Sequence, residues 1–255
     1  MTSPTPSTRI RGGAAPGAAN APDTATMRAI RQTILGGPEL LELVEVPRPR
    51  PSPTEVLVRV TAAGVNPLDW KTRSGGVFLG SPPFTVGADA AGVVEAVSGG
   101  VTRFAVGEHV FGMPRFPHEA GAYAEYITAP SRHLARIPPA LGDVEAAALP
   151  MAGLTAWQAL VDTAGLGPGD RVLIQGAAGG IGHLAVQIAK ARGATVLGTA
   201  RADRHPFLAT LGVDLALDYA TQPAARDIGE VDVVLDLVGG DTALRSCRPS
   251  ATAAS

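Results

Sequence analysis

The sequence predicts an α/β protein in which a β-rich domain precedes a domain built on a parallel sheet. Up to about residue 143, short runs of strand-forming residues alternate with turns rich in proline and glycine, and no long helical period occurs. Beyond that point strands alternate with helices, which implies right-handed crossovers and parallel pairing. We therefore expect a β-rich domain over residues 27–145 and a parallel-sheet domain over residues 146–246.

Local patterns predict the individual elements. In the first domain, strands are expected at residues 56–60 and 92–97, and proline-rich turns at 47–53 and 81–83. In the second domain, strands are expected at 171–175, 195–199, 213–217 and 231–238, the last of them strongly buried. Apolar residues at helical spacing (Ile181, Leu184, Ala185, Ile188 and Ala189) predict a helix after the first of these strands, and a second helix is expected over 204–211.

Composition and charge exclude several classes of partner. The 255 residues are 45% hydrophobic and carry a formal net charge of -2, which suits a globular protein long enough to bury a core. Nucleic-acid binding needs a concentrated basic face, and a membrane span needs roughly 20 apolar residues in a row; the sequence shows neither. Its single cysteine, Cys247, excludes an internal disulfide. We expect a cytoplasmic protein that acts on a small molecule.

The two ends of the sequence differ from the rest. Residues 1–26 are rich in Ser, Thr, Pro, Ala and Gly, and they predict either a disordered tail or an upstream start codon with Met27 as the working start. An organelle transit peptide is the less favoured alternative, because the stretch holds few arginines. Residues 247–255 lack periodicity and are expected to form an irregular tail.

The glycine-rich segment over residues 176–182 (GAAGGIG) carries the clearest functional signal. It lies directly between a predicted strand and an amphipathic helix. Glycines there allow a tight turn and a close approach of the backbone to a pyrophosphate, and the helix N-terminus offers free N–H groups. A turn that merely needs small residues is the alternative. In this context the pattern predicts a dinucleotide-binding loop.

The strand after the loop indicates which dinucleotide is bound. Sites for NAD place Asp or Glu about 20 residues after the loop begins, where it binds the ribose 2′-hydroxyl. Here Thr199, Ala200 and Arg201 occupy that region, and the first acid is Asp203. Arg201 and Arg204 are suited to pair with a 2′-phosphate. NADPH is therefore the expected cofactor, although either arginine alone is also consistent with a solvated surface charge.

Four further segments, taken with this loop, carry a family resemblance. They are the stretch 63–71 (AGVNPLDWK), Gly87-Ala-Asp89 with the strand after it, Gly153-Leu-Thr-Ala-Trp157, and Asp236-Leu-Val-Gly-Gly240. Together they resemble the medium-chain dehydrogenase/reductase superfamily, in its zinc-independent quinone and enone oxidoreductase branch. The resemblance implies a GroES-like β-rich N-terminal domain followed by a Rossmann-type domain.

The resemblance also implies roles for named residues. Asn66 and Lys71 would act at the nicotinamide ribose and the substrate, with Lys71 donating to a developing enolate oxygen; a surface lysine is an equal alternative for Lys71. Asp69 either caps a turn or pairs with Lys71. Tyr123 and Tyr126 are candidates for the cleft. The expected cofactor-binding residues are Thr155, Gly176, Ala178, Gly179, Gly180, Ile181, Gly182, Thr199, Arg201, Arg204, Val238 and Gly239.

The same comparison argues against a metal. Zinc-dependent relatives carry a Cys near the Asn66 position and Gly-His-Glu where this sequence has Gly87, Ala88 and Asp89. The five histidines are too scattered in sequence to form a ligand set. We therefore expect hydride transfer that depends on positioning rather than on a metal.

The expected function is NADPH-dependent, zinc-independent hydride transfer to a quinone or an α,β-unsaturated carbonyl. Enoyl-thioester reduction is the alternative within enzymes. Family members continue beyond the Asp236 segment with further strands, so the resemblance also implies an incomplete Rossmann domain, explained by a frameshift or premature end, and a homodimer without its usual interface strands. A catalytically inactive NADPH-binding protein is therefore the alternative from another class.

Overall fold

The computed structural model describes residues 25–221 and 228–239. Most of the expected N-terminal tail and the whole of the irregular tail over 247–255 lie outside these residues, as does the segment on which the expected premature end depends. Ala25 and Thr26 are described, and the first strand begins at Thr26, the last residue of the expected tail.

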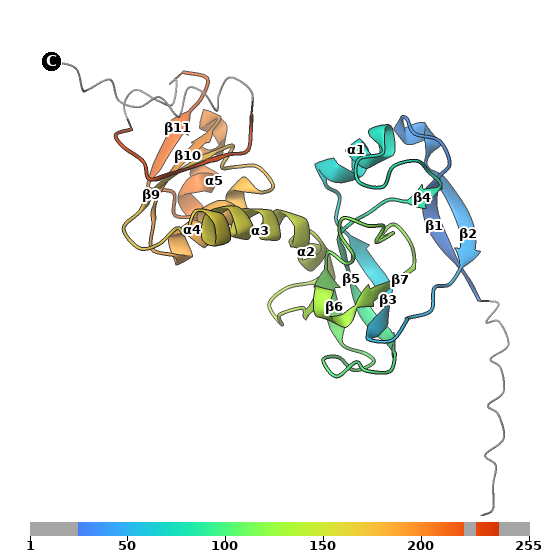
Figure 1. Cartoon of the computed structure of the whole chain (residues 1–255). Helices are drawn as coiled ribbons and strands as arrows, with labels where there is room; N and C mark the ends of the chain where they lie inside the picture. The colour runs from blue at the N-terminus through green and yellow to red at the C-terminus, as the bar shows by residue number, and fades with distance from the viewer. Residues whose placement is uncertain (1–24, 222–227, 240–255) are drawn as a thin grey trace, which may run out of the picture.

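The N-terminal part of the chain is β-rich, as predicted, and forms two antiparallel sheets (Figure 1). The smaller sheet has the order β2-β1-β4, with β1 at Thr26–Gln32, β2 at Glu42–Pro47, β4 at Phe84–Thr85, and a 3₁₀ turn at Pro38–Leu40. The larger has the order β7-β3-β5-β6-β8, formed by β3 (Glu55–Ala63), β5 (Ala90–Val97), β6 (His109–Gly112), β7 (Tyr126–Pro130) and β8 (Leu134–Arg136), with a 3₁₀ turn at Ser131–His133 before β8. Val56 and Val58, at alternate positions of β3, are almost fully buried in the hydrophobic core of this domain.

One helix in this part was not predicted from the sequence, which shows no long helical period before residue 143. Helix α1 runs from Pro67 to Gly75, with Pro67 in its first turn and Gly76 ending it in the left-handed region at φ 69°. Its buried residues are Asp69 and Thr72, both polar. Because this helix packs through polar side chains, the sequence shows no apolar stripe of helical period.

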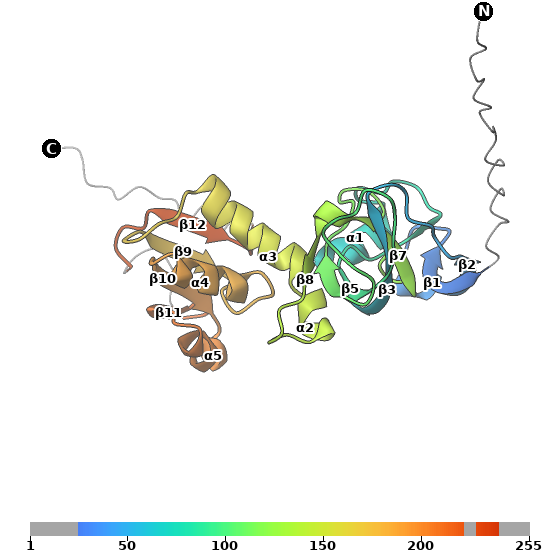
Figure 2. The same ribbon diagram turned by 90° about the horizontal axis from the view of Figure 1, so that it is seen from below.

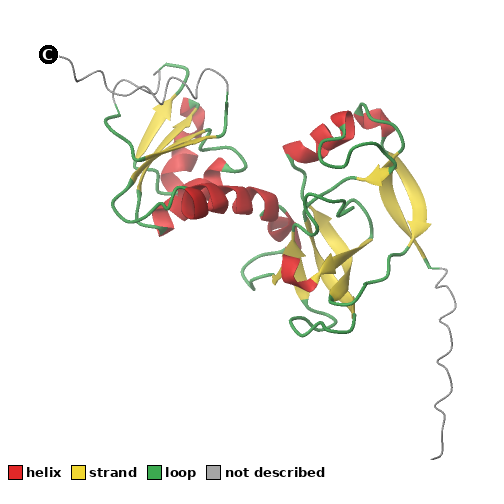
Figure 3. Cartoon of the chain, in the orientation of Figure 1, coloured by secondary structure: helices red, strands yellow, loops and turns green. Residues whose placement is uncertain are grey.

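A run of helices connects the two halves of the molecule. It comprises α2 (Asp143–Ala147), α3 (Pro150–Trp157) and a π-helical segment at Gln158–Thr163. Figure 2 shows α3 extending from the β-rich half toward the second sheet, and Figure 3 shows that strands are concentrated at the two ends of this helical connection. The N-terminus of α3 therefore lies beside the first domain while its body packs on the second.

The second half contains the predicted parallel sheet. Its order is β11-β10-β9-β12, formed by β9 (Arg171–Gln175), β10 (Thr195–Ala200), β11 (Leu215–Asp218) and β12 (Val233–Asp236). Helices α4 (Gly182–Ala191) and α5 (His205–Thr210), the latter after a 3₁₀ turn at Ala202–Arg204, pack with α3 on the face that holds Val172 and Ile174. Leu173 faces the opposite side of the sheet.

Two strands of this sheet are shorter than predicted. β11 begins at Leu215 rather than at residue 213. β12 covers four residues of the expected 231–238 and is half-buried rather than strongly buried. Its ladder partner in the described part of the chain is β9 alone, so it lies at an edge of the described sheet. None of the helices in the described ranges is both long and apolar enough to cross a bilayer.

Candidate active site

A cavity of about 920 Å³ lies where the two halves meet, at the upper end of the size of small-molecule sites. Side chains from both halves line it. The first half contributes residues 64–68, which lead into α1, and the helical connection contributes Ala148, Met151, Ala152 and Thr155. The second half contributes three groups: Gly176 with every residue from Ala178 to His183; Thr199, Ala200, Arg201, Asp203 and Arg204; and Tyr219 with Leu237. The last three groups follow the carboxyl ends of parallel strands, where ligands bind in open α/β sheets.

The glycine loop has the geometry that a pyrophosphate requires. Gly176 turns the chain at φ 71°, and a Cβ on Gly182 would lie 2.2 Å from the Gly176 carbonyl oxygen. Both positions therefore require glycine. A Cβ built on Gly180 would meet no atom within 4 Å, so the backbone there faces open space. Helix α4 begins at Gly182, which lines the same cavity, and a helix N-terminus favours negative charge. The loop thus fits the pyrophosphate of a dinucleotide.

Two arginines lie at one end of the cavity. Arg201 donates a hydrogen bond from Nε to the Tyr219 hydroxyl at 2.9 Å, and this bond raises the pKa of the guanidinium. Arg204 lies beside Asp203, with Nε 3.9 Å from a carboxylate oxygen. These exposed side chains place positive charge after β10, where the cofactor ribose is expected.

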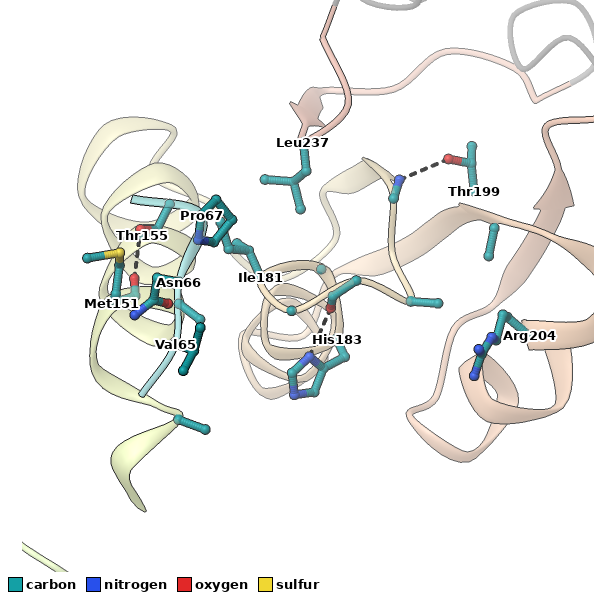
Figure 4. Close-up of a pocket in the computed structure, with 18 of the residues that line it drawn as sticks. Val65, Asn66, Pro67, Met151, Thr155, Ile181, His183, Thr199, Arg204 and Leu237 are labelled. Atoms are coloured by element: carbon teal, nitrogen blue, oxygen red, sulfur yellow. Dashed lines mark hydrogen bonds between the residues drawn. The ribbon is translucent and has the colours of Figure 1, made fainter. Parts of the chain in front are cut away.

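Asn66 lies at the other end, directly before α1 (Figure 4). Its backbone N–H donates to the Asp69 carboxylate at 2.7 Å, so the interpretation of Asp69 as a cap is confirmed. Its side-chain amide nitrogen donates to Asp89 Oδ2 at 2.9 Å. The backbone N–H of Met151 in α3 donates to the same oxygen at 3.1 Å. Asn66 is therefore held through both its backbone and its side chain.

The groups behind Asn66 are buried and titratable. Asp89 is completely buried, and this burial raises its pKa to about 6. Burial also raises the pKa of Asp69. Tyr123 lies nearby, and its own burial, with the negative charge of Asp69, raises the pKa of the phenol. The Asn66 end of the cavity is thus backed by carboxyl groups held out of water.

The structure brings together most of the predicted site residues. Eleven of them line the cavity: Asn66, Thr155, Gly176, Ala178, Gly179, Gly180, Ile181, Gly182, Thr199, Arg201 and Arg204. Their roles toward a cofactor stay predictions.

Three predicted site residues are not among the described residues that line the cavity. Lys71 is exposed, with its amine 5.7 Å from the Trp70 ring centroid. Val238 and Gly239 donate their N–H groups to the Asp236 carboxylate at 2.9 and 3.0 Å, which turns the chain after β12. Leu237 lines the cavity in their place.

Several lining residues escaped the sequence interpretation. Tyr219 directly follows β11 and Leu237 follows β12, so the rule that sites lie after parallel strands was the signal for both. His183 lies in the first turn of α4, and its Nδ1 is 3.0 Å from the Gly179 carbonyl oxygen. Tyr123 and Tyr126, the cleft candidates, do not line the cavity in the described structure, and Tyr126 packs under the Arg48 guanidinium.

The described residues do not fit a zinc ion. No three His, Cys, Asp or Glu side chains in residues 25–221 and 228–239 form a group that could hold a metal. Asp89, at the position of the ligand-bearing motif in zinc enzymes, uses its oxygen for Asn66 and Met151 instead.

Comparison with known proteins identifies both halves. The family model of the alcohol dehydrogenase GroES-like domain matches residues 52–139, and that of zinc-binding dehydrogenases matches residues 180–254. A 2-haloacrylate reductase of a Burkholderia species is 41% identical over 224 residues, 83% of this chain and 66% of that protein. The quinone oxidoreductase of Homo sapiens is 40% identical over 177 residues, 68% of this chain and 53% of that protein.

Solved structures agree with these relatives. The quinone oxidoreductase from Coxiella burnetii has a TM-score of 0.79 at 38% identity, covering 87% of this chain and 72% of that one. The CurK enoyl reductase has a TM-score of 0.77 at 31% identity, covering 87% and 70%. The chain spans between about half and two thirds of the length of the curated relatives named above. With both domains, the glycine loop and these relatives in agreement, the chain belongs to the medium-chain dehydrogenase/reductase superfamily, and its relatives there include quinone oxidoreductases and a 2-haloacrylate reductase.

Proposed function

We propose that the protein is an NADPH-dependent reductase that transfers a hydride to a quinone or an α,β-unsaturated carbonyl without a metal ion. The observation that carries this proposal is that one cavity has the glycine loop and two arginines on one side and Asn66 and Thr155 on the other. The relatives named as quinone oxidoreductases and as a 2-haloacrylate reductase support the substrate class.

Each group in the cavity has a binding task in this proposal. The loop N–H groups and the α4 N-terminus bind the pyrophosphate. Arg201 and Arg204 pair with the 2′-phosphate, which distinguishes NADPH from NADH. Bound NADPH supplies the hydride.

In this proposal the nicotinamide half of NADPH is bound by hydrogen-bond acceptors on Thr155 and Asn66. Thr155 donates its hydroxyl proton to the Met151 carbonyl oxygen at 2.7 Å, so its oxygen is left to accept a hydrogen bond from the carboxamide. Asn66 contacts the nicotinamide ribose. These contacts orient the cofactor toward a substrate in the cavity, and orientation is the main contribution of the protein to such a reaction.

Enoyl-thioester reduction is the second candidate, because the CurK enoyl reductase has the same fold at 31% identity. We favour the quinone or enone substrate, since quinone oxidoreductases recur among the relatives of highest identity.

The test follows the absorbance of the reduced nicotinamide with purified protein. NADPH is offered with p-benzoquinone, a 2-haloacrylate and a crotonyl thioester in separate reactions. Oxidation of NADPH in the reactions with p-benzoquinone and the 2-haloacrylate, if it persists after treatment with a metal chelator, supports the proposal. Oxidation with the thioester alone favours the second candidate, and binding of NADPH without oxidation above background leaves a non-catalytic NADPH-binding protein.

The cytoplasmic location and the homodimer are part of this proposal and await their own measurements. Light scattering of the purified protein measures the oligomeric state.

A further inference from the structure

We propose that Asp89 is a positioning residue, which through one carboxylate oxygen orients the Asn66 amide and fixes it to the first turn of α3. The inference rests on the proposed function, because it concerns how the nicotinamide half of the cofactor is held. It adds a residue that does not itself line the cavity.

The geometry joins two walls of the cavity at one atom. Asp89 Oδ2 accepts hydrogen bonds from Asn66 Nδ2 at 2.9 Å and from the Met151 N–H at 3.1 Å. Asn66 belongs to the β-rich half, whereas Met151 lies in the helix that leads to the second sheet. Both residues line the cavity, and Figure 4 shows them side by side with Thr155. Movement of one wall relative to the other would break one of these bonds.

The bond also determines which way the Asn66 amide faces. An ionised carboxylate only accepts hydrogen bonds, so Asn66 must present its NH₂ group to Asp89. The amide carbonyl oxygen is then left as the acceptor on the other side of the group. A ribose hydroxyl is a donor of the kind that this oxygen would bind. If the Asn66 amide were flipped, its NH₂ group would replace the carbonyl oxygen on the cavity side. That side of Asn66 would then no longer favour a hydroxyl donor of the ribose.

Asp89 is held rigidly and out of reach of a ligand. Its side chain is completely buried, and its backbone carbonyl oxygen accepts the Gly64 N–H at 3.1 Å. A Cβ on Gly64 would lie 2.8 Å from the Asp89 Cβ, so the two chains are in close contact there. Asp89 therefore acts on a cofactor only through Asn66 and α3.

The burial of the Asp89 carboxylate opposes folding. A buried carboxylate is costly unless its oxygens are bonded, and Oδ1 has no hydrogen-bond partner among the described residues. The negative charge near the α3 N-terminus offsets part of this cost. An apolar residue would occupy this position without the cost of burying a carboxylate. A residue that lowers the stability of the fold at its own position is typical of functional sites.

The test compares two substitutions at this position with two probes. Asp89→Leu removes the acceptor and keeps a side chain branched at Cγ, whereas Asp89→Asn keeps a carbonyl oxygen that accepts both bonds. The probes are NADPH and 2′,5′-ADP, which lacks the nicotinamide half. We expect Asp89→Leu to weaken NADPH binding by up to about tenfold, the effect of losing the hydrogen bond between a ribose hydroxyl and Asn66, with 2′,5′-ADP binding unchanged. Asp89→Asn should stay within about twofold of the original protein for both probes.

The outcomes separate this inference from the proposed function. Unchanged NADPH affinity in Asp89→Leu, or an equal loss for both probes, would overturn the positioning role while leaving the function intact. An original protein that binds neither probe would overturn both. If the leucine variant does not fold, as judged by its thermal unfolding, Asp89→Ala removes the acceptor without adding a branch, and the same comparison applies.

Discussion

The side-chain oxygen of Thr199 accepts a hydrogen bond from the backbone N–H of Gly176 at 3.1 Å. The Thr199 carbonyl oxygen accepts a second one, from the Ala177 N–H at 3.0 Å. Thr199 lies near the end of β10 and Gly176 directly after β9, so these bonds anchor the start of the glycine loop to the neighbouring strand. The loop is therefore held by the sheet before any ligand binds, which lowers the ordering cost of binding.

Replacing Thr199 by valine keeps the shape and removes the acceptor. We expect the free energy of unfolding to fall by about 1 kcal/mol, the usual effect of one lost hydrogen bond, and the affinity for NADPH to fall several-fold as the loop loosens. Chemical denaturation and fluorescence titration measure the two. Thr195→Val, on the same strand but outside the cavity, is the matched control, and equal effects of both substitutions would argue against the anchoring role.

Gly182→Ala and Gly180→Ala should differ in their effect on the melting temperature. At Gly182 the new Cβ would lie 2.2 Å from the Gly176 carbonyl oxygen and 2.8 Å from backbone atoms of Ala177, so the loop must move. At Gly180 the Cβ meets nothing within 4 Å. We expect Gly182→Ala to lower the melting temperature and Gly180→Ala to leave it unchanged. Equal melting temperatures would show that the loop is not packed as described.

Joint replacement of Arg201 and Arg204 by alanine tests cofactor choice. Charge-assisted bonds to a phosphate contribute about 1.5–3 kcal/mol, so NADPH affinity should fall at least tenfold. NADH affinity should change little, because NADH lacks the 2′-phosphate. Isothermal titration with both cofactors measures this, with Arg132→Ala as a control outside the cavity lining. A parallel loss for both cofactors would refute the 2′-phosphate assignment.

The raised pKa of Asp89 predicts a pH dependence of stability. Folding raises this pKa from 3.8 to about 6, so the folded protein holds the proton more tightly than the unfolded chain, although the carboxyl is mostly ionised at pH 7. Its stabilising contribution is complete below about pH 4 and is lost as the pH rises through about 6. Since one pKa unit corresponds to about 1.4 kcal/mol, Asp89→Asn should gain up to about 3 kcal/mol on the original protein between pH 4 and 7. Denaturation across this range measures it, with exposed Asp162→Asn as control; parallel curves would contradict the shift.

The sequence predicted what depends on local geometry. Strands β3, β9 and β10 follow from runs of β-branched and apolar residues, and the glycine loop follows from backbone conformations that side chains forbid. Such features need only neighbours in sequence. Arg201 and Arg204 line the cavity because both follow the carboxyl end of β10, which topology alone determines.

The rest depends on contacts between distant segments. Helix α1 escaped prediction because it buries Asp69 and Thr72 rather than an apolar stripe. The role of Asp89 depends on a hydrogen bond from Met151, which lies 62 residues later in the chain. Lys71 follows the segment that contains Asn66, yet the turn of α1 leaves its side chain exposed and outside the cavity lining. Sequence proximity does not determine which side of a short polar helix faces a site.

The central claim is that residues 176–182 bind the pyrophosphate of NADPH. Fluorescence titration of the original protein, Gly179→Asp and Gly179→Asn with NADPH tests it most directly. A Cβ at Gly179 already lies 3.1 Å from the Gly176 carbonyl oxygen, and a carboxylate there would add charge repulsion to this crowding. We expect saturable binding by the original protein, weaker binding by the asparagine variant and none by the aspartate variant. NADPH affinity that is unchanged in Gly179→Asp would contradict it.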